Sequence, residues 1–393
     1  MTQQNTATNV SETADVFKLL KEIKEVNASS IAKAETQRVI LPEPPQGWMG
    51  PWEPDFEDGY EIIDAYGNKV TTKHFFDAYV RAEVLHFYGK AGAGKSTLGY
   101  HLVDMANIAA GIYEKNREIY EENCKRKAKD GDKAQLEGYI VPPYLAEGIH
   151  VNKFSTPEDL IGTLKCKTDE QGNKIWHAVL GQVLGAWSTG LPGDPNPSLG
   201  KTAIMDEGDT IPPDVTSILH GLFDQRTKQV TLHIDGPMTF TKALRFRLIV
   251  TSNTMGRGEN ELNFAGTQPQ NGALLERYSY SYQIPWMKPA SEINLLTKKT
   301  GIDEDVAKKM VDVAQKIREQ EEKGEFLYTC STRKLLAWCR ECRDEEKRSG
   351  KPQNLSDYWR RIAVRSACPN VLAHIDDETT LEGMKRFISV VSA

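Results

Sequence analysis

An apolar run that breaks into a glycine-rich loop constrains this 393-residue chain more than any other feature. Residues 84–88 are Val-Leu-His-Phe-Tyr, and residues 89–96 are Gly-Lys-Ala-Gly-Ala-Gly-Lys-Ser. Residues 97–102 begin a helical pattern, so the loop has the strand–loop–helix context that the phosphate-binding motif G-x-x-x-x-G-K-[ST] requires. Glycines let main-chain N–H groups approach phosphate oxygens, and the helix N-terminus adds partial positive charge. The sequence therefore predicts a nucleotide-binding α/β fold.

The residues of this loop have distinct expected roles. We expect Lys95 to reach the β- and γ-phosphates of ATP and the Ser96 hydroxyl to hold Mg²⁺. The expected nucleotide-binding residues are Gly89, Ala91, Gly92, Ala93, Gly94, Lys95, Ser96 and Thr97. The alternative interpretation is a glycine turn with a structural role only.

The composition places few limits on partners. With 39% hydrophobic residues the chain can bury a full core and form two or three domains. Its net charge of −6 gives no overall reason to expect nucleic-acid binding, although a local basic channel stays possible. The sequence contains neither a secretory apolar segment at its start nor an apolar run long enough to cross a bilayer. We therefore expect a cytoplasmic protein without membrane association.

The six cysteines are scattered, which suits a reducing compartment. Cys339 and Cys342 form a C-x-x-C pair within a stretch of helical pattern. A zinc site would need further ligands such as Cys330 or Cys368. Ordinary packed thiols are the alternative interpretation.

The chain divides into three expected parts. Residues 1–80 form an N-terminal extension with a polar tail, a short amphipathic helix over residues 16–26 and a Trp/Pro-rich connector over residues 41–54. Residues 81–285 form an α/β core, and residues 286–393 form a small all-helical domain.

Periodicity and turn signals predict the elements of these parts. Helical pattern covers residues 73–81 and a charged, exposed insertion at 114–132. Strands are expected at 148–152, 202–205 and 247–251, with hairpins around 172 and 235–236 and a long loop at 190–200. Strands that alternate with helices indicate a parallel sheet.

Two acidic residues end the strand at 202–205. Asp206 is placed to support Mg²⁺, and Glu207 to orient and polarise an attacking water. Two adjacent carboxylates after a buried strand are costly without a balancing cation. The alternative is a surface turn in which the acids only interact with solvent.

Three further polar residues are candidates for hydrolysis. Asn253 ends the strand at 247–251 and can contact a γ-phosphate or the attacking water without adding charge. Arg277 and Arg333 can each clamp a phosphate with two donors, and Arg277 can act on a neighbouring subunit's nucleotide. Arg257 and Arg226 are the alternatives for that second role.

These residues resemble the MoxR-like branch of the AAA+ ATPases and, within it, the ATPase subunit of aerobic cobaltochelatase. The similarity lies between residues 87 and 334 apart from 114–132. Its most informative segments are residues 156–162, 246–258, 264–268, 270–271 and 275–278.

The resemblance implies a role for each candidate residue. Lys95 and Ser96 take the Walker A role, Asp206 and Glu207 Walker B, Asn253 sensor 1, Arg277 the arginine finger and Arg333 sensor 2. The hairpins fall where the family carries its helix-2 and pre-sensor-1 insertions, which face a central pore. The fold implied is an AAA+ αβα sandwich with a parallel sheet, followed by a helical lid domain.

The resemblance also implies an assembly: a ring, usually a hexamer, with ATP between subunits. Family members commonly work with a partner that carries a von Willebrand factor A domain, and they remodel or load another protein. The Trp/Pro-rich N-terminal region, the charged insertion and the 190–200 loop depart from a chelatase subunit. Similar ATPases occur in phages and mobile elements, so the client protein and the origin of the chain stay open.

Three functions are compatible with these observations. The leading hypothesis is an ATPase that remodels or loads a protein partner. A DNA-directed motor of a phage or defence system would need a basic pore, for which the lysines at 165, 167, 174 and 228 are candidates although Asp169 and Glu170 lie beside them. A ring that ATP only holds together is the third, and Glu207 argues against it.

Overall fold

The computed structural model describes residues 38–45, 47–50, 60, 62–63, 68–168, 172–195, 197–234, 236–255, 270–373 and 375–390. The expected N-terminal helix over residues 16–26, Arg257 and the segment 264–268 lie outside these ranges. The tips of the two hairpins, residues 169–171 and 235, also lie outside them.

The core is a parallel sheet of five strands in the order β13–β4–β12–β9–β6. The strands are β4 (Leu85–Tyr88), β6 (Ala146–His150), β9 (Thr202–Asp206), β12 (Arg247–Ser252) and β13 (Tyr280–Gln283). The earliest strand, β4, lies between the last two, so the chain crosses over the sheet repeatedly. Because all strands run the same way, their carboxyl ends share one edge, where such sheets place their ligands.

Successive residues of a strand point to opposite faces of the sheet, and here the side chains on both faces are apolar. Helices therefore cover both faces. Ile204 and Ile249 pack against α2 (Thr72–Val80) and α3 (Lys95–Ala109) on one face. Met205 and Val250 pack on the other face against α6 (Gln182–Trp187) and α7 (Pro213–Phe223). The predicted three-layer αβα sandwich is therefore confirmed.

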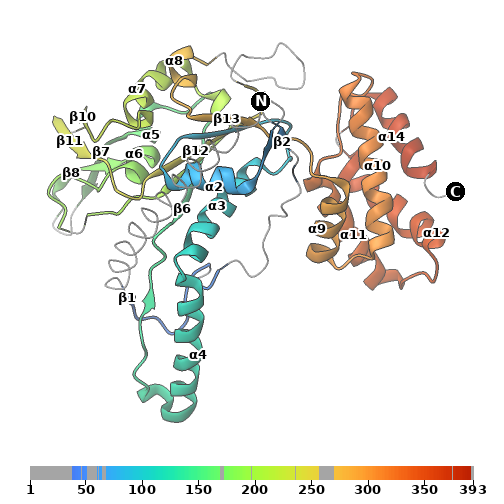
Figure 1. The fold of residues 1–393 in the computed structure, drawn as a ribbon, viewed down its shortest axis with the longest axis horizontal. Coiled ribbons are helices and arrows are strands. Elements are labelled where there is room, and N and C mark those ends of the chain that lie inside the picture. The colour runs from blue at the N-terminus through green and yellow to red at the C-terminus, as the bar shows by residue number, and fades with distance from the viewer. Residues whose placement is uncertain are drawn as a thin grey trace, which may run out of the picture.

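The charged insertion forms a helix, as predicted. The chain turns at Gly111, whose φ is +68°, and continues as α4 (Ile112–Asp130), which projects away from the sheet (Figure 1). Asn116 fastens the returning chain to α4, because its amide exchanges hydrogen bonds with the N–H and carbonyl of Ile140, each at 2.8–2.9 Å. Asn123 does the same with Glu137 at 3.0 and 2.8 Å.

Both predicted hairpins are present and project at the same end of the molecule (Figure 1). They are β7 (Gly162–Thr168) with β8 (Lys174–Leu180), and β10 (Gln229–His233) with β11 (Pro237–Thr241). Shorter elements of the core are β1 (Arg38–Val39), β2 (Ile62–Ile63), β3 (Lys69–Val70), η1 (Gly131–Lys133), β5 (Tyr139–Ile140), α5 (Pro157–Leu160), η2 (Gly208–Thr210) and α8 (Gly272–Leu275).

The C-terminal part is a separate helical unit with its own core (Figure 1). It comprises α9 (Pro289–Thr300), α10 (Glu304–Glu322), α11 (Thr332–Ser349), α12 (Leu355–Tyr358), η4 (Trp359–Ala363), α13 (Val364–Ala367), η5 (Cys368–Leu372) and α14 (Glu378–Val390). Trp338 and Trp359 meet edge to face at its centre, 5.7 Å between ring centres. This is the predicted helical lid.

The C-x-x-C pair lies inside the lid core. Cys339 and Cys342 are buried free thiols, and burial raises the pKa of both. Among the described residues, no group of three or more His, Cys, Asp or Glu side chains is placed to hold a metal ion. Over the same part of the chain, no helix has the length and apolar character that a membrane span needs.

Candidate functional site

The glycine loop and the start of α3 form a cradle at the carboxyl end of β4. Gly92 and Gly94 have φ of +80° and +94°, a region that side chains strongly disfavour. A Cβ on Gly94 would also lie 2.3 Å from the hydroxyl oxygen of Tyr60. Glycine is therefore required at position 94 both by its backbone conformation and by the close approach of Tyr60.

Lys95 is buried at the first position of α3 and its ammonium is fully engaged by acceptors. Its Nζ donates to the carbonyls of Gly89 at 2.8 Å and Lys90 at 3.0 Å, and to Oδ1 of Asn253 at 3.2 Å. Burial lowers the pKa of Lys95 to about 8, against the opposing effect of the nearby carboxylates of Asp209 and Asp206. The structure thus brings Lys95 and Asn253 together, as the sequence predicted.

Asp206 ends β9 directly beside the loop. Its Oδ1 accepts hydrogen bonds from the hydroxyls of Ser96, at 2.5 Å, and Thr251, at 2.6 Å. The Nδ1 atom of His150, at the end of β6, lies 3.8 Å from Oδ2. Ser96 and Asp206, far apart in the sequence, thus meet at one point.

Oxygen donors of this kind fit Mg²⁺. Magnesium keeps several waters and is held by one or two protein oxygens together with substrate phosphates, rather than by a cage of side chains. The Ser96 hydroxyl and the Asp206 carboxylate, in contact beside the glycine loop, are such a pair.

Glu207 follows Asp206 in an unusual conformation. Its φ of +59° makes it one of two non-glycine residues with positive φ in the described chain, at a cost of roughly 1–3 kcal/mol. The Thr210 N–H and hydroxyl both donate to its carbonyl at 2.8 Å, which holds this turn. The turn directs the exposed Glu207 side chain to the cleft that Lys95 and Asp206 also line.

Asp209 is a residue of the site that the sequence analysis missed. It is buried, and its Oδ2 accepts from the N–H groups of Asn253 and Thr254 at 3.1 and 2.9 Å and from the Thr254 hydroxyl at 2.9 Å. Asp209 therefore fixes the loop that presents Asn253. Nothing in its local sequence distinguishes it from a solvent-exposed turn residue.

Two adjoining cavities meet at the loop. The first, of about 300 Å³, contains Lys95, Asp206, Glu207 and Asn253. The second, of about 250 Å³, lies between the loop, the N-terminal segment and the lid. Both cavities are lined by Gly92, Gly94, Thr97 and Arg333. Two cavities joined in this way suit a ligand with a phosphate tail and a bulky base.

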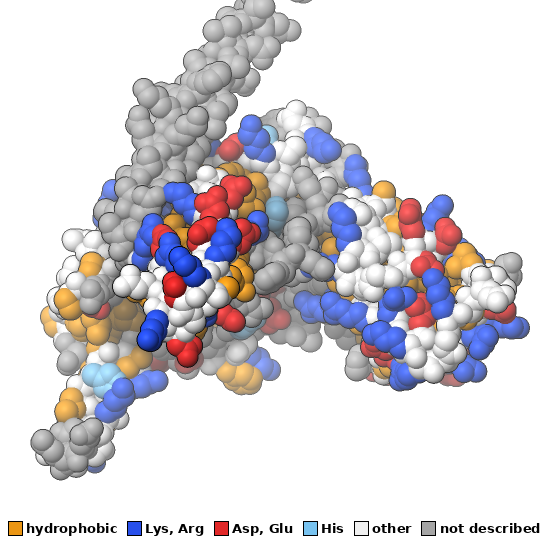
Figure 2. Space-filling view, turned by 90° about the horizontal axis from the view of Figure 1, so that it is seen from below, with side chains coloured by type: hydrophobic (Ala, Val, Ile, Leu, Met, Phe, Trp, Pro, Cys, Tyr) orange, Lys and Arg blue, Asp and Glu red, His pale blue; other side chains and the backbone are white. Residues whose placement is uncertain are grey.

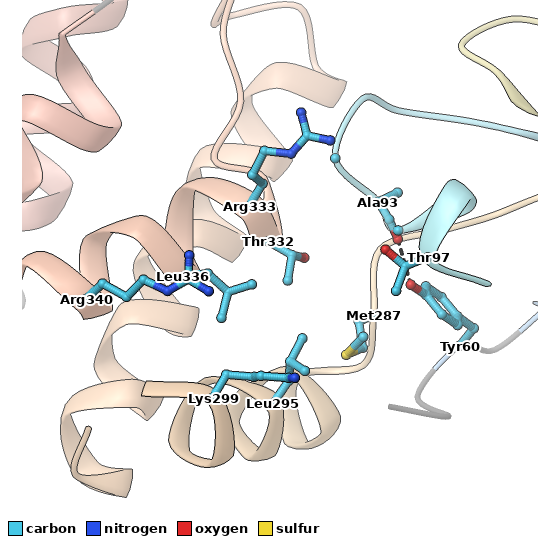
Figure 3. Close-up of a pocket in the computed structure, with 12 residues that line it drawn as sticks. Tyr60, Ala93, Thr97, Met287, Leu295, Lys299, Thr332, Arg333, Leu336 and Arg340 are labelled. Atoms are coloured by element: carbon cyan, nitrogen blue, oxygen red, sulfur yellow. Dashed lines mark hydrogen bonds between the residues drawn. The ribbon is translucent and has the colours of Figure 1, made fainter. Parts of the chain in front are cut away.

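Figure 3 shows the second cavity. Tyr60 lies on one side, where its hydroxyl donates to the carbonyl of Ala93 at 2.7 Å. Across the cavity, α9 contributes Leu295 and Lys299, and α11 contributes Leu336 and Arg340. Tyr60 comes from the N-terminal extension, after the connector, and no sequence pattern assigned it to the site.

Arg333 lies at the start of α11, with its side chain directed toward the glycine loop (Figure 3). The lid approaches the loop closely, since a Cβ on Gly92 would meet the Cβ of Ser331 at 2.7 Å. Lys90 of the loop also forms an ion pair with Glu321 of α10, 2.6 Å between Nζ and Oε1.

A buried ion pair holds the N-terminal end of α11 in place. Arg318 of α10 donates to both carboxylate oxygens of Glu292 of α9 at 2.9 and 2.8 Å, and the Thr332 hydroxyl donates to Glu292 at 2.6 Å. The Arg318 guanidinium lies 4.3 Å from the ring centre of Trp286, in the segment between the two domains. This cluster joins three lid helices to the interdomain segment, next to Arg333.

Arg277 lies apart from the other candidates. It precedes β13, whose first residue is paired with the start of β4, whereas the glycine loop follows the end of β4. Its Nε donates to the carbonyl of His220 at 3.1 Å and its Nη1 to that of Ala273 at 2.5 Å. Arg277 is thus at the opposite edge of the sheet from Lys95 of the same chain.

Comparisons with known proteins agree with this geometry. Residues 292–391 match the CbbQ/NirQ/NorQ C-terminal family, and residues 145–266 match the AAA domain of the dynein-related subfamily. The chain is 27% identical over 140 residues to the aerobic cobaltochelatase subunit CobS of Sinorhizobium sp.. That match spans 34% of this chain and 42% of the relative, less than half of its length.

The two domain matches and the partial CobS match support a MoxR-like AAA+ ATPase. The glycine loop at residues 89–96 lies before both matched segments. The insertion that contains α4 lies between that loop and the start of the AAA match.

Solved structures show lower similarity to this chain. A RuvB mutant of Thermotoga maritima is 10% identical with a TM-score of 0.41, over 76% of this chain and 67% of that one. The Thermotoga maritima RuvB Holliday junction branch migration motor is 13% identical with a TM-score of 0.39, over 81% and 72% of the two chains. At these scores the similarity carries no argument about function.

Proposed function

We propose that this protein hydrolyses ATP at the subunit interfaces of a homo-oligomeric ring, with six subunits expected, and uses the cycle to remodel or load a protein partner. One observation carries the proposal. Lys95, Asp206 and Asn253 meet at the carboxyl edge of the sheet, while Arg277 lies at the opposite edge. A site that needs all four groups can be completed by a second copy of the chain.

The chemistry follows from the groups at the carboxyl edge. The loop amides and the Lys95 ammonium bind the phosphate tail, and the lysine exchanges its bonds to protein carbonyls for bonds to phosphate oxygens. Ser96 and Asp206 would hold a Mg²⁺ ion, which would supply positive charge for the phosphates. Glu207, held toward the cleft by its strained turn, orients and polarises the attacking water.

Three further groups then contact the nucleotide or the attacking water. Asn253 contacts the γ-phosphate or the water without adding charge. Arg277 of the adjacent subunit stabilises the transition state, and Arg333 ties the lid to the nucleotide. Hydrolysis therefore depends on assembly, and lid movement follows the state of the nucleotide.

The MoxR and CobS likeness supports a protein partner, for which a von Willebrand factor A domain protein is the expected type. The DNA-directed alternative lacks a specific observation in its favour. The face of the molecule in Figure 2 has basic and acidic side chains mixed together, without a continuous basic surface. The exposed part of the β7–β8 hairpin carries the candidate lysines Lys165, Lys167 and Lys174. ATP hydrolysis that DNA stimulates in a salt-dependent way would favour the DNA-directed alternative.

Phosphate release and equilibrium ATP binding test the catalytic part of the proposal. Lys95→Ala should abolish ATP binding, while Glu207→Gln should bind ATP normally and hydrolyse it about a hundredfold or more slowly. Glu147→Gln is the matched control, because Glu147 is paired with Lys201 on the sheet, outside the cleft. Normal turnover of Glu207→Gln would remove Glu207 from the mechanism.

Mixed rings test the role of Arg277 across the interface. Lys95→Ala subunits cannot bind ATP but can supply Arg277, and Arg277→Ala subunits can bind ATP but supply no arginine. Each variant alone should be inactive, and the mixture should regain turnover. A mixture that stays inactive, although the rings assemble, would refute the shared site.

A further inference from the structure

A buried histidine joins three strands of the sheet. His86 lies on β4 between β12 and β13, and only 2% of it is exposed. Its Nε2 lies 2.7 Å from the hydroxyl oxygen of Ser252 on β12, and its Nδ1 lies 3.1 Å from that of Ser281 on β13. Both ring nitrogens are therefore engaged. His86 itself does not line the cleft described above, but its partner Ser252 does.

The direction of these hydrogen bonds follows from Ser252. The Ser252 hydroxyl donates its one proton to the carbonyl of Thr254 at 2.5 Å, so it accepts from His86 and Nε2 carries the imidazole proton. Nδ1 then accepts from the Ser281 hydroxyl. Burial, which lowers the pKa of His86 to about 4, keeps the ring neutral and this arrangement intact at neutral pH.

On one side, His86 is connected to the loop that presents Asn253. Ser252 immediately precedes Asn253, and its hydroxyl closes the turn onto Thr254. Asp209 holds the same turn from the other direction through the N–H groups of Asn253 and Thr254. A displacement of the Asn253 loop must therefore stretch the His86–Ser252 bond or carry the imidazole with it.

On the other side, His86 packs against the residue next to Arg277. The Tyr278 ring lies 4.6 Å from the imidazole, centre to centre, at 32°. Tyr278 is buried, and its pKa is raised by that burial and by the negative charge of Asp209, which lies near enough to act on it. The backbone that carries Arg277 is thus anchored by a ring in contact with His86.

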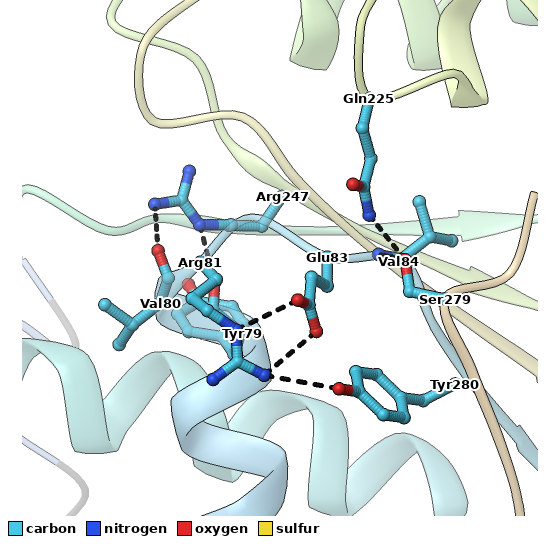
Figure 4. Close-up of polar contacts among 9 residues, drawn as sticks. All are labelled: Tyr79, Val80, Arg81, Glu83, Val84, Gln225, Arg247, Ser279 and Tyr280. Carbon is cyan, nitrogen blue, oxygen red and sulfur yellow. Dashed lines mark hydrogen bonds and ion pairs between the residues drawn. The ribbon is translucent and has the colours of Figure 1, made fainter. Parts of the chain in front are cut away.

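The following residues leave this anchor little freedom. Ser279 accepts hydrogen bonds from the Val84 N–H, at 3.1 Å, and from the Gln225 side chain (Figure 4). The chain then enters β13, where Ser281 contacts His86. Arg277 is therefore attached to the sheet through Tyr278 and β13, both of which contact the same imidazole.

We propose that His86 and Tyr278 are positioning residues that couple the Asn253 loop of one nucleotide site to Arg277, which serves the next site in the ring. The inference rests on the proposed function, in which Arg277 acts across the subunit interface. The packed path Ser252–His86–Tyr278 fixes the position of Arg277 relative to the Asn253 loop. An error of about 1 Å in such a group can lower the rate roughly a hundredfold.

Mixed rings isolate the effect on Arg277 from any effect on the subunit's own site. Donor subunits carry Lys95→Ala and supply Arg277; acceptor subunits carry Arg277→Ala and hydrolyse ATP. His86→Leu is then added to the donor only, where no nucleotide is bound. We expect acceptor turnover to fall about tenfold or more while acceptor ATP affinity is unchanged.

Phe87→Leu in the donor is the matched control. Phe87 is the next residue of β4, is equally buried, and faces the opposite core, 5.3 Å from the ring centre of Phe75. Full acceptor turnover with the His86→Leu donor would overturn the inference, as would an equal loss with both donors. An inactive parental mixture would instead refute the shared site itself.

A second variant interrupts the same connection from the other side. Tyr278→Leu removes the ring that contacts His86 and should also lower acceptor turnover. The double variant His86→Leu/Tyr278→Leu should be no worse than the more damaging single variant, because both interrupt one connection. Losses that multiply would show that the two residues act independently and would overturn the coupling.

Discussion

Replacing Arg318 by methionine tests how strongly one buried ion pair holds the lid together. The guanidinium donates to Glu292 at 2.9 and 2.8 Å and to the carbonyl of Cys330 at 2.8 Å, and it lies over Trp286. Methionine keeps much of the side-chain volume. It leaves the Glu292 carboxylate, which is 0% exposed, with the Thr332 hydroxyl as its remaining donor in the described structure.

The expected loss of unfolding free energy is large because the buried Glu292 carboxylate loses its cationic partner. Removing one partner of a buried pair costs roughly 3–5 kcal/mol. We expect Arg318→Met to lower the free energy of unfolding by about 4 kcal/mol. The double variant Glu292→Leu/Arg318→Met should recover most of the loss, since an apolar pair of similar volume needs no charge partner.

Urea unfolding followed by tryptophan fluorescence measures this effect, because Trp338 and Trp359 lie in the lid core. Lys347→Met, which removes an exposed pair with Asp344, is the control and should leave the transition midpoint in place. A loss below about 1 kcal/mol in Arg318→Met would refute the reasoning. So would a double variant whose loss equals the sum of the two single losses.

Two further predictions concern the polar groups under the nucleotide site. Because burial lowers the pKa of His86 to about 4, the unfolded chain binds more protons than the folded one between that pH and about 6.5, and stability is lost as the pH falls through this window. Urea unfolding at several pH values should show a loss of up to about 3 kcal/mol that is absent in His86→Gln; an unchanged pH slope in the variant would contradict this. Asp209→Ala removes the acceptor of the N–H groups of Asn253 and Thr254, and should lower turnover more than ATP affinity in phosphate-release and binding assays; an equal loss in both would exclude a role confined to the Asn253 loop.

Local patterns predicted much of the fold. The glycine loop required a strand before it and a helix after it, and both are present as β4 and α3. The apolar runs that end at Asp206 and Asn253 are neighbouring parallel strands, which is why both side chains reach the same edge. The proposed catalytic roles of these residues remain predictions that the variants above test.

Other members of the site could not be predicted because their local sequences are ordinary. Tyr60 belongs to a part of the N-terminal extension with no nucleotide-binding motif, yet its hydroxyl contacts the glycine loop. Glu292 and Arg318 have the composition of exposed helix residues, and their burial appears only when α9 and α10 pack together. Such contacts are long-range, so no pattern along the chain contains them.

The sequence by itself determined that a phosphate-binding loop opens a helix after a buried strand, because backbone conformation and hydrophobic periodicity are local properties. Only the tertiary structure decided that Arg277 and Lys95 lie at opposite edges of one sheet and that His86 lies between the segments that carry Asn253 and Arg277. The physical reason is strand order: β4 is placed between the distant strands β12 and β13 by crossover connections, and this pairing brings together side chains separated by about half the chain.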